Sequence, residues 1–268
     1  MSQELAEMME QAWSSLEEVA SQLEPGEWEL PTDCPGWDVR DQVAHINGIE
    51  ATRLGRPAQP ELPVEPDYIR NEMGSRNERE IRGRGALKPE ELLVEYRDVT
   101  AERAKFLAGL SEEEWAADTE GVVGRGPMSE VIKIRILDVF YHDQDIRVAT
   151  GRPGGMHGEV ARFVFERMAA AMPFVVGKRA AASDGQSVVF EVGEPGETFT
   201  IGMRGGRGGP LEQLPEHPTV RLQMDCETFL RLCGGRWTSQ RVEEEGRLHV
   251  TGDRDLADRI LSNMAITP

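Results

Sequence analysis

Two kinds of feature are scarce in this 268-residue chain, and each scarcity excludes a class of protein. There are only three cysteines, Cys34, Cys226 and Cys233, and no two of them form a Cys-x-x-Cys pair. An odd, scattered set argues against a disulfide framework and a zinc ribbon, and it fits a reduced cytosol. No run approaches the roughly 18 apolar residues of a membrane-spanning helix. The composition is therefore that of a water-soluble globular protein.

Positive charge is also in short supply. The chain has 30 lysines and arginines against 48 acidic residues, a net charge of −18. No basic cluster is dense enough to outweigh the surrounding acid, so nucleic acid and anionic membrane surfaces are not expected as partners. The N-terminal MSQELAEMMEQAWSSLEE has no basic start followed by an apolar core. We therefore expect no export signal and a cytoplasmic protein.

The first half of the chain has the apolar spacing of helices. Residues 3–23 place apolar side chains every three or four positions, which predicts an amphipathic helix. Asp38 is expected to cap a second helix, which the proline-rich RPAQPELPVEP ends near residue 54. A glycine-rich turn, EGVVGRGPM, precedes the last helix of this half. The other predicted helices cover residues 66–82, 89–110 and 129–149.

The pattern changes near Gly155. A helix is expected in EVARFVFERMAAAMPFVVG, but SVVFEV, ETFTIGM and TVRLQM alternate apolar and polar residues as half-buried strands do. A short helix (DCETFLRLCGG), a strand (GRLHVTG) and a capped final helix (DRDLADRILSNM) follow, and RGGRGGP is expected to be a hairpin or a flexible loop. The predicted fold class is α plus α+β, with a helical bundle at 1–153 and a small α+β domain at 154–268.

Two helices of the predicted bundle carry the residues of a possible metal site. Asp138 and His142 are four residues apart, so they share one helix face, and His45 lies on another helix. Two imidazoles and one carboxylate suit zinc or another divalent transition metal, and three protein ligands leave a position open. By spacing alone a solvated surface pair is the more common arrangement. Asp143 and Asp145 are expected to be surface charges, although Asp145 could accept a hydrogen bond from His142.

Two segments carry a family resemblance. DCPGWDVRDQVAHINGIE and RILDVFYHDQDIRVATGRP resemble the motifs of the mycothiol-dependent maleylpyruvate isomerase family, whose bundle is DinB-like. In that family both motifs supply histidine ligands, which match His45 and His142. Asp138 stands where the family has a glutamate. Aspartate is one methylene shorter, so its helix must lie closer to the metal, or the metal must be held differently. The resemblance implies a DinB-like four-helix bundle with a metal, expected to be zinc, at these three residues.

The C-terminal region resembles the sterol-carrier-like domain that often follows this bundle, on the segment PTVRLQMDCETFLRLCGGRW and the later GRLHVTGDRDLADRILSNM. In the family an arginine of this domain helps bind or polarise the acidic substrate. Arg236 and Arg241 are the nearest candidates for that catalytic role, and neither aligns firmly. Arg135 is expected to form a salt bridge with an inner acid such as Asp138 or Glu50.

The resemblance implies an enzyme, an isomerase or thiol transferase whose partners are mycothiol, a low-molecular-weight thiol, and a small electrophilic substrate. A metal-bound thiol loses its proton more easily, so thiolate is available at neutral pH. The thiolate would add to a carbon of the substrate, and either leave after bond rotation or stay attached.

Cys34 is then not required as a nucleophile, and we expect it to be a packing residue of the turn that Trp37 staples to the bundle core. The alternative is a non-catalytic small-molecule-binding or stress-response protein with a vestigial site.

Overall fold

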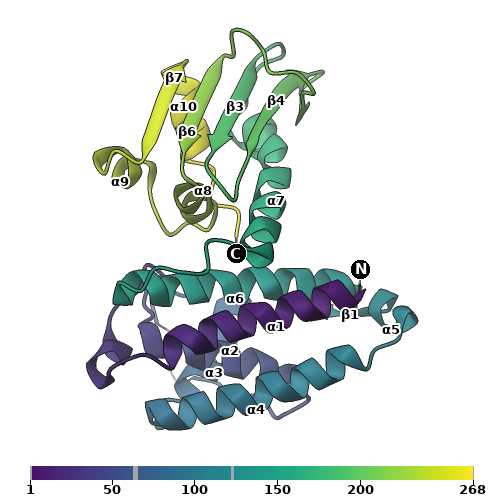
Figure 1. Ribbon diagram of the computed structural model, residues 1–268, viewed down its shortest axis with the longest axis vertical. Helices are drawn as coiled ribbons and strands as arrows, with labels where there is room; N and C mark the ends of the chain where they lie inside the picture. The colour runs from purple at the N-terminus through teal and green to yellow at the C-terminus, as the bar shows by residue number, and fades with distance from the viewer. Residues whose placement is uncertain (1, 63–65, 122–123, 268) are drawn as a thin grey trace. The chain divides into compact units, whose positions relative to one another are not determined.

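The computed structural model describes residues 2–62, 66–121 and 124–267. It divides the chain into two compact units, residues 1–155 and 156–268 (Figure 1). The first unit is helical and the second is α+β, so the predicted fold class is confirmed. Within the described residues, no helix is both long and apolar enough to cross a lipid bilayer.

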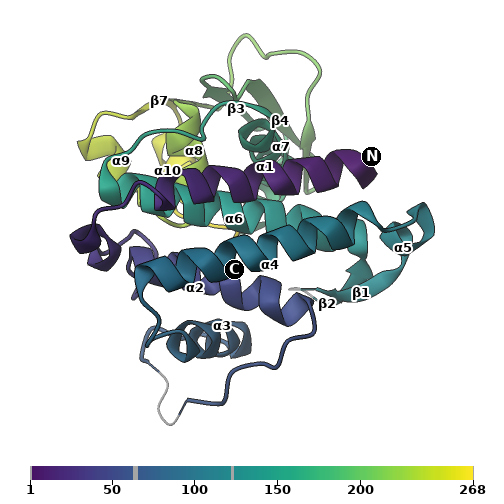
Figure 2. The ribbon, with the colours of Figure 1, turned by 60° about the horizontal axis from the view of Figure 1, so that its bottom comes forward.

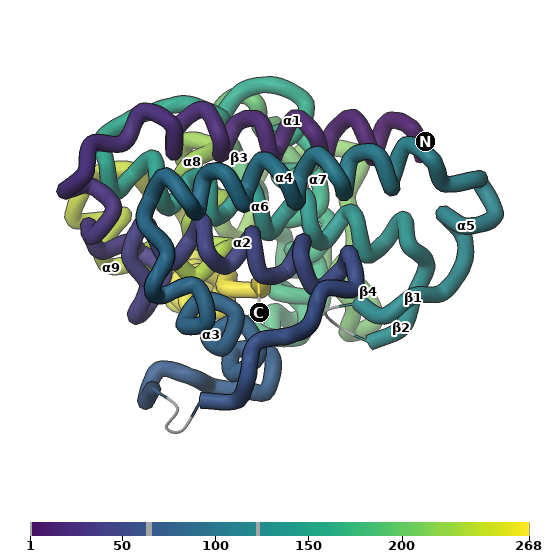
Figure 3. Tube along the Cα trace, turned by 90° about the horizontal axis from the view of Figure 1, so that it is seen from below, coloured from purple at the N-terminus to yellow at the C-terminus, as the bar shows by residue number. Residues whose placement is uncertain are grey.

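Four long helices lie side by side in the first unit (Figures 2 and 3). Helix α1 contacts α4 and α6, and α2 contacts the same two helices, so the four surround one core. The stripe predicted on the first helix is confirmed, because Leu5, Met9, Trp13 and Leu16 are all buried. The four helices are α1 (Ser2–Ala20), α2 (Val39–Arg53), α4 (Pro89–Ala108) and α6 (Met128–Thr150).

Shorter elements connect these helices. The 3-10 helix η1 (Pro25–Glu29) follows α1, helix α3 (Glu72–Gly83) packs on α2, and α5 (Glu112–Ala116) precedes α6. The segment expected to be a glycine-rich turn contains β2 (Gly124–Pro127) and the end of β1 (Asp118–Gly121), two antiparallel strands that the sequence did not predict. A strand of four residues that includes glycine has too few apolar side chains to show an alternation of apolar and polar positions, so a sequence pattern does not reveal it.

The second unit is built on a mixed five-stranded sheet of order β5-β4-β3-β6-β7. Strands β3 and β6 are parallel, and the other pairs are antiparallel. The predicted hairpin at RGGRGGP is confirmed, since it joins β4 to β5. The strands are β3 (Ser187–Val192), β4 (Thr198–Arg204), β5 (Arg207–Pro210), β6 (Val220–Met224) and β7 (Leu248–Gly252).

Helices pack on this sheet and contribute side chains to the core of the second unit. Four phenylalanines, Phe165, Phe190, Phe199 and Phe229, come from two helices and two strands, and their contacting rings have centroids 4.8 to 6.2 Å apart. Aromatic rings in this range stabilise one another beyond the area that they bury. The helical elements are α7 (Glu159–Phe174), the π-helical turn η2 (Val175–Arg179), α8 (Cys226–Cys233), α9 (Ser239–Glu244) and α10 (Arg254–Leu261).

Candidate metal centre

Helix α2 starts at a capping box that sets the position of its first polar side chains. The Asp38 carboxylate accepts from the backbone N–H of Asp41 at 2.9 Å, and the Asp41 carboxylate accepts from the N–H of Asp38. This reciprocal pairing satisfies two N–H groups that a helix start leaves open, and confirms Asp38 as the predicted N-cap. Gln42 and His45 follow at a spacing of three, so both side chains lie on one face of α2.

Three side chains from α2 and α6 converge at the centre of the bundle. His45 Nε2 lies 3.3 Å from Asp138 Oδ2, and His142 Nε2 lies 3.4 Å from Asp138 Oδ1. One ligand atom from each residue lies within 4.8 Å of the other two. Both imidazoles are buried, whereas 30 % of the Asp138 side chain is exposed, so solvent reaches the cluster at the carboxylate.

A chain of hydrogen bonds fixes the orientation of His142. The Thr32 hydroxyl donates to the Trp37 carbonyl at 2.8 Å, so it accepts from the Gln42 amide nitrogen at 2.7 Å. The other end of the amide, Gln42 Oε1, therefore faces His142 Nδ1 and accepts a hydrogen bond from its N–H. With the proton at Nδ1, the lone pair of a neutral His142 is at Nε2, next to Asp138.

This arrangement fits a bound cation. His142 Nε2 and Asp138 Oδ1 are both electron-rich, and two such atoms at 3.4 Å repel each other unless a cation or a proton lies between them. Burial lowers the pKa of His45 to about 4, even though the nearby Asp138 carboxylate acts to raise it. This imidazole therefore stays neutral and able to bind a metal. Its Nδ1 is buried and has no hydrogen-bond partner among the described residues. The three side chains thus offer the nitrogen and oxygen donors of a zinc-type site.

Buried ion pairs support the carboxylate ligand. Arg135 Nη2 donates to Glu50 Oε1 at 2.7 Å, Arg103 Nε donates to Glu50 Oε2 at 3.0 Å, and Arg135 Nη1 donates to Asp138 Oδ2. Burial alone would raise the pKa of Asp138, but the Arg135 guanidinium holds it well below its usual range. Asp138 is therefore ionised, as a metal ligand must be. The salt bridge predicted for Arg135 is confirmed with both acids that were considered.

Trp37 lies against the two histidines. Its ring centroid is 5.0 Å from that of His45 and 5.6 Å from that of His142, and its indole N–H donates to Glu78 Oε2 at 3.1 Å. The Tyr68 hydroxyl donates to the other oxygen of Glu78 at 2.8 Å. Trp37 is half-buried and packs its ring on two buried residues of the bundle, which agrees with the prediction that it staples the turn to the bundle core. It forms an aromatic wall of the candidate metal centre, held in place from α3.

Two aspartates after His142 are placed differently from the prediction. Asp143 and Asp145 are both buried, so the expectation of surface charges was wrong. Asp143 forms an ion pair with Arg147 at 3.0 Å. Asp145 comes within 3.7 Å of His142 Nδ1, but the hydrogen bond of that nitrogen goes to Gln42. Helix α6 is covered on most of its surface, which explains why charges there are buried in pairs.

Cysteines and the remaining histidines lie outside the cluster of three ligands. Cys34 is half-buried in its turn, whereas Cys226 and Cys233 are buried in α8, where burial raises the pKa of the Cys226 thiol to about 11. Across the described parts of the chain, the only group of three potential metal ligands is that of His45, Asp138 and His142. His157, His217 and His249 take no part in it.

The two arginines predicted to be catalytic lie in the second unit. Arg241 stacks its guanidinium 4.7 Å from the Trp237 ring centroid and pairs with Glu245 at 3.0 Å. Arg236 donates to the Gly234 carbonyl at 3.0 Å. The contact with Trp237 is that of Arg241, and the catalytic role of both arginines stays a prediction.

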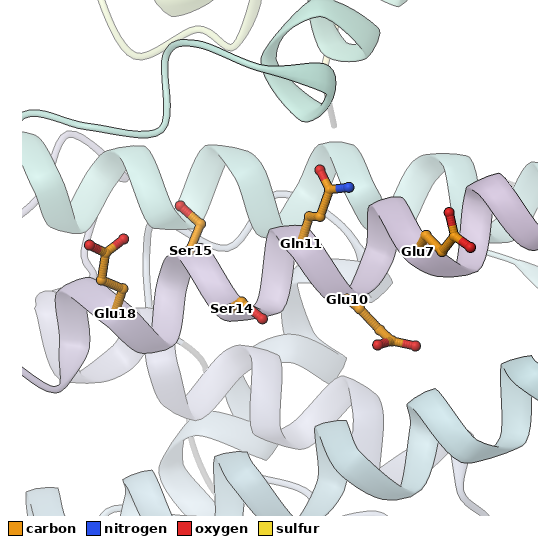
Figure 4. A pocket seen from close by; sticks show the side chains of 6 residues that line it. All are labelled: Glu7, Glu10, Gln11, Ser14, Ser15 and Glu18. Carbon is orange, nitrogen blue, oxygen red and sulfur yellow. The ribbon is translucent and has the colours of Figure 1, made fainter.

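Polar residues of α1 line an open depression on the first unit (Figure 4). Its six residues are Glu7, Glu10, Gln11, Ser14, Ser15 and Glu18. None of the three candidate ligands lines it, and all six belong to a single helix. The depression is therefore separate from the metal centre.

Sequence reasoning named the three candidate ligands but missed Gln42 and Thr32. Gln42 lies one helical turn before His45, and that spacing alone could have marked it as a neighbour of the site. The contribution of Thr32 depends on how its turn folds back on α2, which no spacing in the sequence indicates.

Together these features define a class of protein, one in which a helical bundle with a His–Asp–His cluster precedes an α+β unit. The family model of the mycothiol maleylpyruvate isomerase N-terminal domain matches residues 9–147, a range that includes all three candidate ligands. The model of the SCP-2 sterol transfer family matches residues 165–262. This chain belongs to the mycothiol-dependent maleylpyruvate isomerase family, as its two motifs predicted.

Two solved structures are similar over most of both chains. The crystal structure of the mycothiol-dependent maleylpyruvate isomerase has a TM-score of 0.58 and 19 % identity, covering 88 % of this chain and 90 % of that one. A variant of the same enzyme, in which one histidine is replaced by alanine, gives 0.56 and 18 %, covering 94 % and 93 %. At this identity the likeness establishes the fold. No curated protein matches the chain.

Proposed function

We propose that this protein is a metal- and mycothiol-dependent enzyme that isomerises a small electrophilic substrate or transfers the thiol to it. The observation that carries the proposal is the cluster in which His142 Nε2 lies 3.4 Å from Asp138 Oδ1 and His45 Nε2 lies 3.3 Å from Asp138 Oδ2. Membership of the family supports the thiol and the reaction class. We expect a divalent metal, zinc or another transition metal that two imidazoles and one carboxylate suit.

His45, Asp138 and His142 would hold this metal. The bound metal would take up the sulfur of the thiol and lower its pKa, so that thiolate is available at neutral pH. Gln42 keeps the proton of His142 on Nδ1, away from the metal, and Arg135 keeps Asp138 ionised. The exposed part of Asp138 marks the side from which a thiol could enter.

An acidic substrate would need a cationic partner outside the ligand set. Arg236 and Arg241 remain our proposal for this role, supported by the family resemblance. The alternative of a binding protein with a vestigial site has less support. Its apolar ligand would have to enter a second unit whose core is packed with four phenylalanine rings.

Metal content tests the first half of the proposal. Protein purified without added metal should contain about one divalent ion per chain, and His45→Ala and His142→Ala should lose it. His157→Ala removes an exposed histidine of the second unit and serves as the matched control. Asp138→Glu should keep or improve metal binding, and Asp138→Ala should lower it. Full occupancy in both ligand-histidine variants would refute the assignment.

Cobalt substitution tests the thiol. A sulfur–cobalt bond gives a charge-transfer band that oxygen and nitrogen ligands do not give. Mycothiol should produce this band in the wild type and in Cys34→Ser, because no cysteine of the chain is required, and not in His142→Ala. If the wild type binds cobalt but shows no band at saturating thiol, the thiol-dependent mechanism fails and the binding-protein alternative takes its place.

A further inference from the structure

The described hydrogen bonds of the Arg135 guanidinium all go to two carboxylates, those of Glu50 and Asp138. Its Nε and Nη2 donate to the same oxygen of Glu50, Oε1, at 3.0 and 2.7 Å, and its Nη1 donates to Asp138 Oδ2. Glu50 is fully buried and is held from its other side by Arg103. A planar guanidinium that donates through two nitrogens to a buried carboxylate cannot turn without losing both hydrogen bonds and leaving its own buried charge poorly paired, which is costly. Arg135 is therefore a fixed group.

This fixed group divides the two oxygens of Asp138. Oδ2 accepts a charge-assisted hydrogen bond from Arg135 and also lies 3.3 Å from His45 Nε2, while Oδ1 faces His142 Nε2 at 3.4 Å. A carboxylate oxygen that already accepts a hydrogen bond from arginine is a weaker ligand for a metal cation. The positive charge of the guanidinium also repels a cation at that oxygen.

We propose that Arg135 is a positioning residue of the metal centre, which withholds Asp138 Oδ2 so that a single carboxylate oxygen is available to the ion. This inference rests on the proposed function. A carboxylate that gave both oxygens would occupy the coordination position that the thiol sulfur needs. By holding Oδ2, Arg135 keeps that position open, and it does so from α6 itself, three residues before the ligand.

Arg103 provides a matched control, because it also donates to Glu50 but is not bonded to Asp138. Arg135→Met and Arg103→Met each remove one buried cation beside the same acid. In cobalt-loaded Arg135→Met, the second oxygen is released, so the coordination number rises and the visible absorption of the ion falls severalfold. The thiol charge-transfer band should then need about tenfold more thiol, the lower end of what a lost neighbour of a ligand costs. Arg103→Met should keep the wild-type spectrum and thiol dependence.

Several outcomes would overturn the inference. A spectrum unchanged in Arg135→Met, or changed equally in Arg103→Met, would mean that Arg135 has only a structural role. If Arg135→Met does not fold, X-ray absorption of the zinc-loaded wild type decides, since a carboxylate bound through both oxygens brings its carbon closer to zinc. A carboxylate bound through both oxygens contradicts the inference, and one bound through a single oxygen supports it. A wild type that takes up no cobalt refutes the proposed function and this inference with it.

Discussion

At the scale of single residues, the amide of Gln42 determines which nitrogen of His142 can meet a metal. Its Nε2 is committed to Thr32, so its Oε1 must accept from His142 Nδ1. An imidazole held in this way presents Nε2 in a fixed direction and pays less entropy on binding an ion. Gln42 is fully buried, so no water replaces its hydrogen bond when the amide is removed.

Gln42→Leu should therefore lower the affinity for zinc or cobalt by about 10- to 100-fold, as removal of such a partner generally does. Chelator competition would measure the change. Gln42→Glu keeps an oxygen acceptor facing His142 and should retain most of the affinity, which makes it the control for lost packing. Equal losses in the two variants would show that the hydrogen bond to Nδ1 is not what matters.

The sequence predicted the candidate ligands better than their surroundings. Asp138 and His142 share a helix face by arithmetic, and the structure brings His45 to them. Asp143 and Asp145 were misplaced because charged side chains were expected to lie on an exposed face of their helix. Helix α6 has no such face along this stretch, and its burial depends on three-dimensional packing that a local pattern does not contain.

At the scale of elements, the capping box of α2 positions half of the site. The helix begins at Asp38, and Gln42, His45 and Glu50 follow at fixed rotations from that start. If the first turn unwinds, Gln42 moves first, because it lies only four residues from the cap. The stability of one helix end is thus coupled to the orientation of His142.

Asp38→Ala should destabilise the protein by about 1 kcal/mol, the typical cost of a lost N-cap side chain. It should also weaken metal binding, though less than Gln42→Leu does. Urea unfolding and chelator competition would measure the two effects, with Asp38→Asn as a control that retains a capping oxygen. Unchanged stability in Asp38→Ala would mean that tertiary contacts alone hold the start of α2.

Elements with a strong repeating pattern were predicted, and short ones were not. Strands β3, β4 and β6 were confirmed as strands, but β3 is buried at five of its six positions and not half-buried as expected. Strands β1 and β2 are four residues long, and α9 has six, so each shows at most one turn or two alternations. Their existence depends on neighbouring elements, which is information that a local sequence window lacks.

At the scale of the whole molecule, the buried His45 makes folding stability depend on pH. Its pKa is lowered to about 4 in the folded protein, whereas an unfolded histidine titrates near 6.5. Between these values the unfolded chain binds a proton that the folded chain does not. The free energy of unfolding therefore falls as the pH falls from 6.5 to 4.

For the metal-free protein this loss should amount to about 3 kcal/mol across the window. Urea unfolding after chelator treatment, repeated at several pH values, would measure it. The His45→Gln variant removes the titrating group, so the difference between the two proteins isolates its effect. Parallel stability curves for wild type and variant between pH 4 and 6.5 would contradict this account.

The division of the chain after residue 153 stays a prediction about functional domains, although the contacts separate residues 1–155 from 156–268. All three candidate ligands and the groups that hold them belong to the first unit, whereas Arg236 and Arg241 belong to the second. Metal binding and the proposed recognition of an acidic substrate are thus assigned to different units of one chain.

The buried charges around the centre also decide what can compete for it. Glu50 and Asp138 carry two negative charges, and Arg103 and Arg135 carry two positive ones, so these four cancel. A divalent ion bound by neutral imidazoles would then keep much of its double charge, offset in part by the buried Asp145, whose Oδ2 lies 3.7 Å from His142 Nδ1. Chloride and hydroxide are consequently the natural rivals of a thiolate here, and the halide content of a buffer would set how readily the centre accepts sulfur.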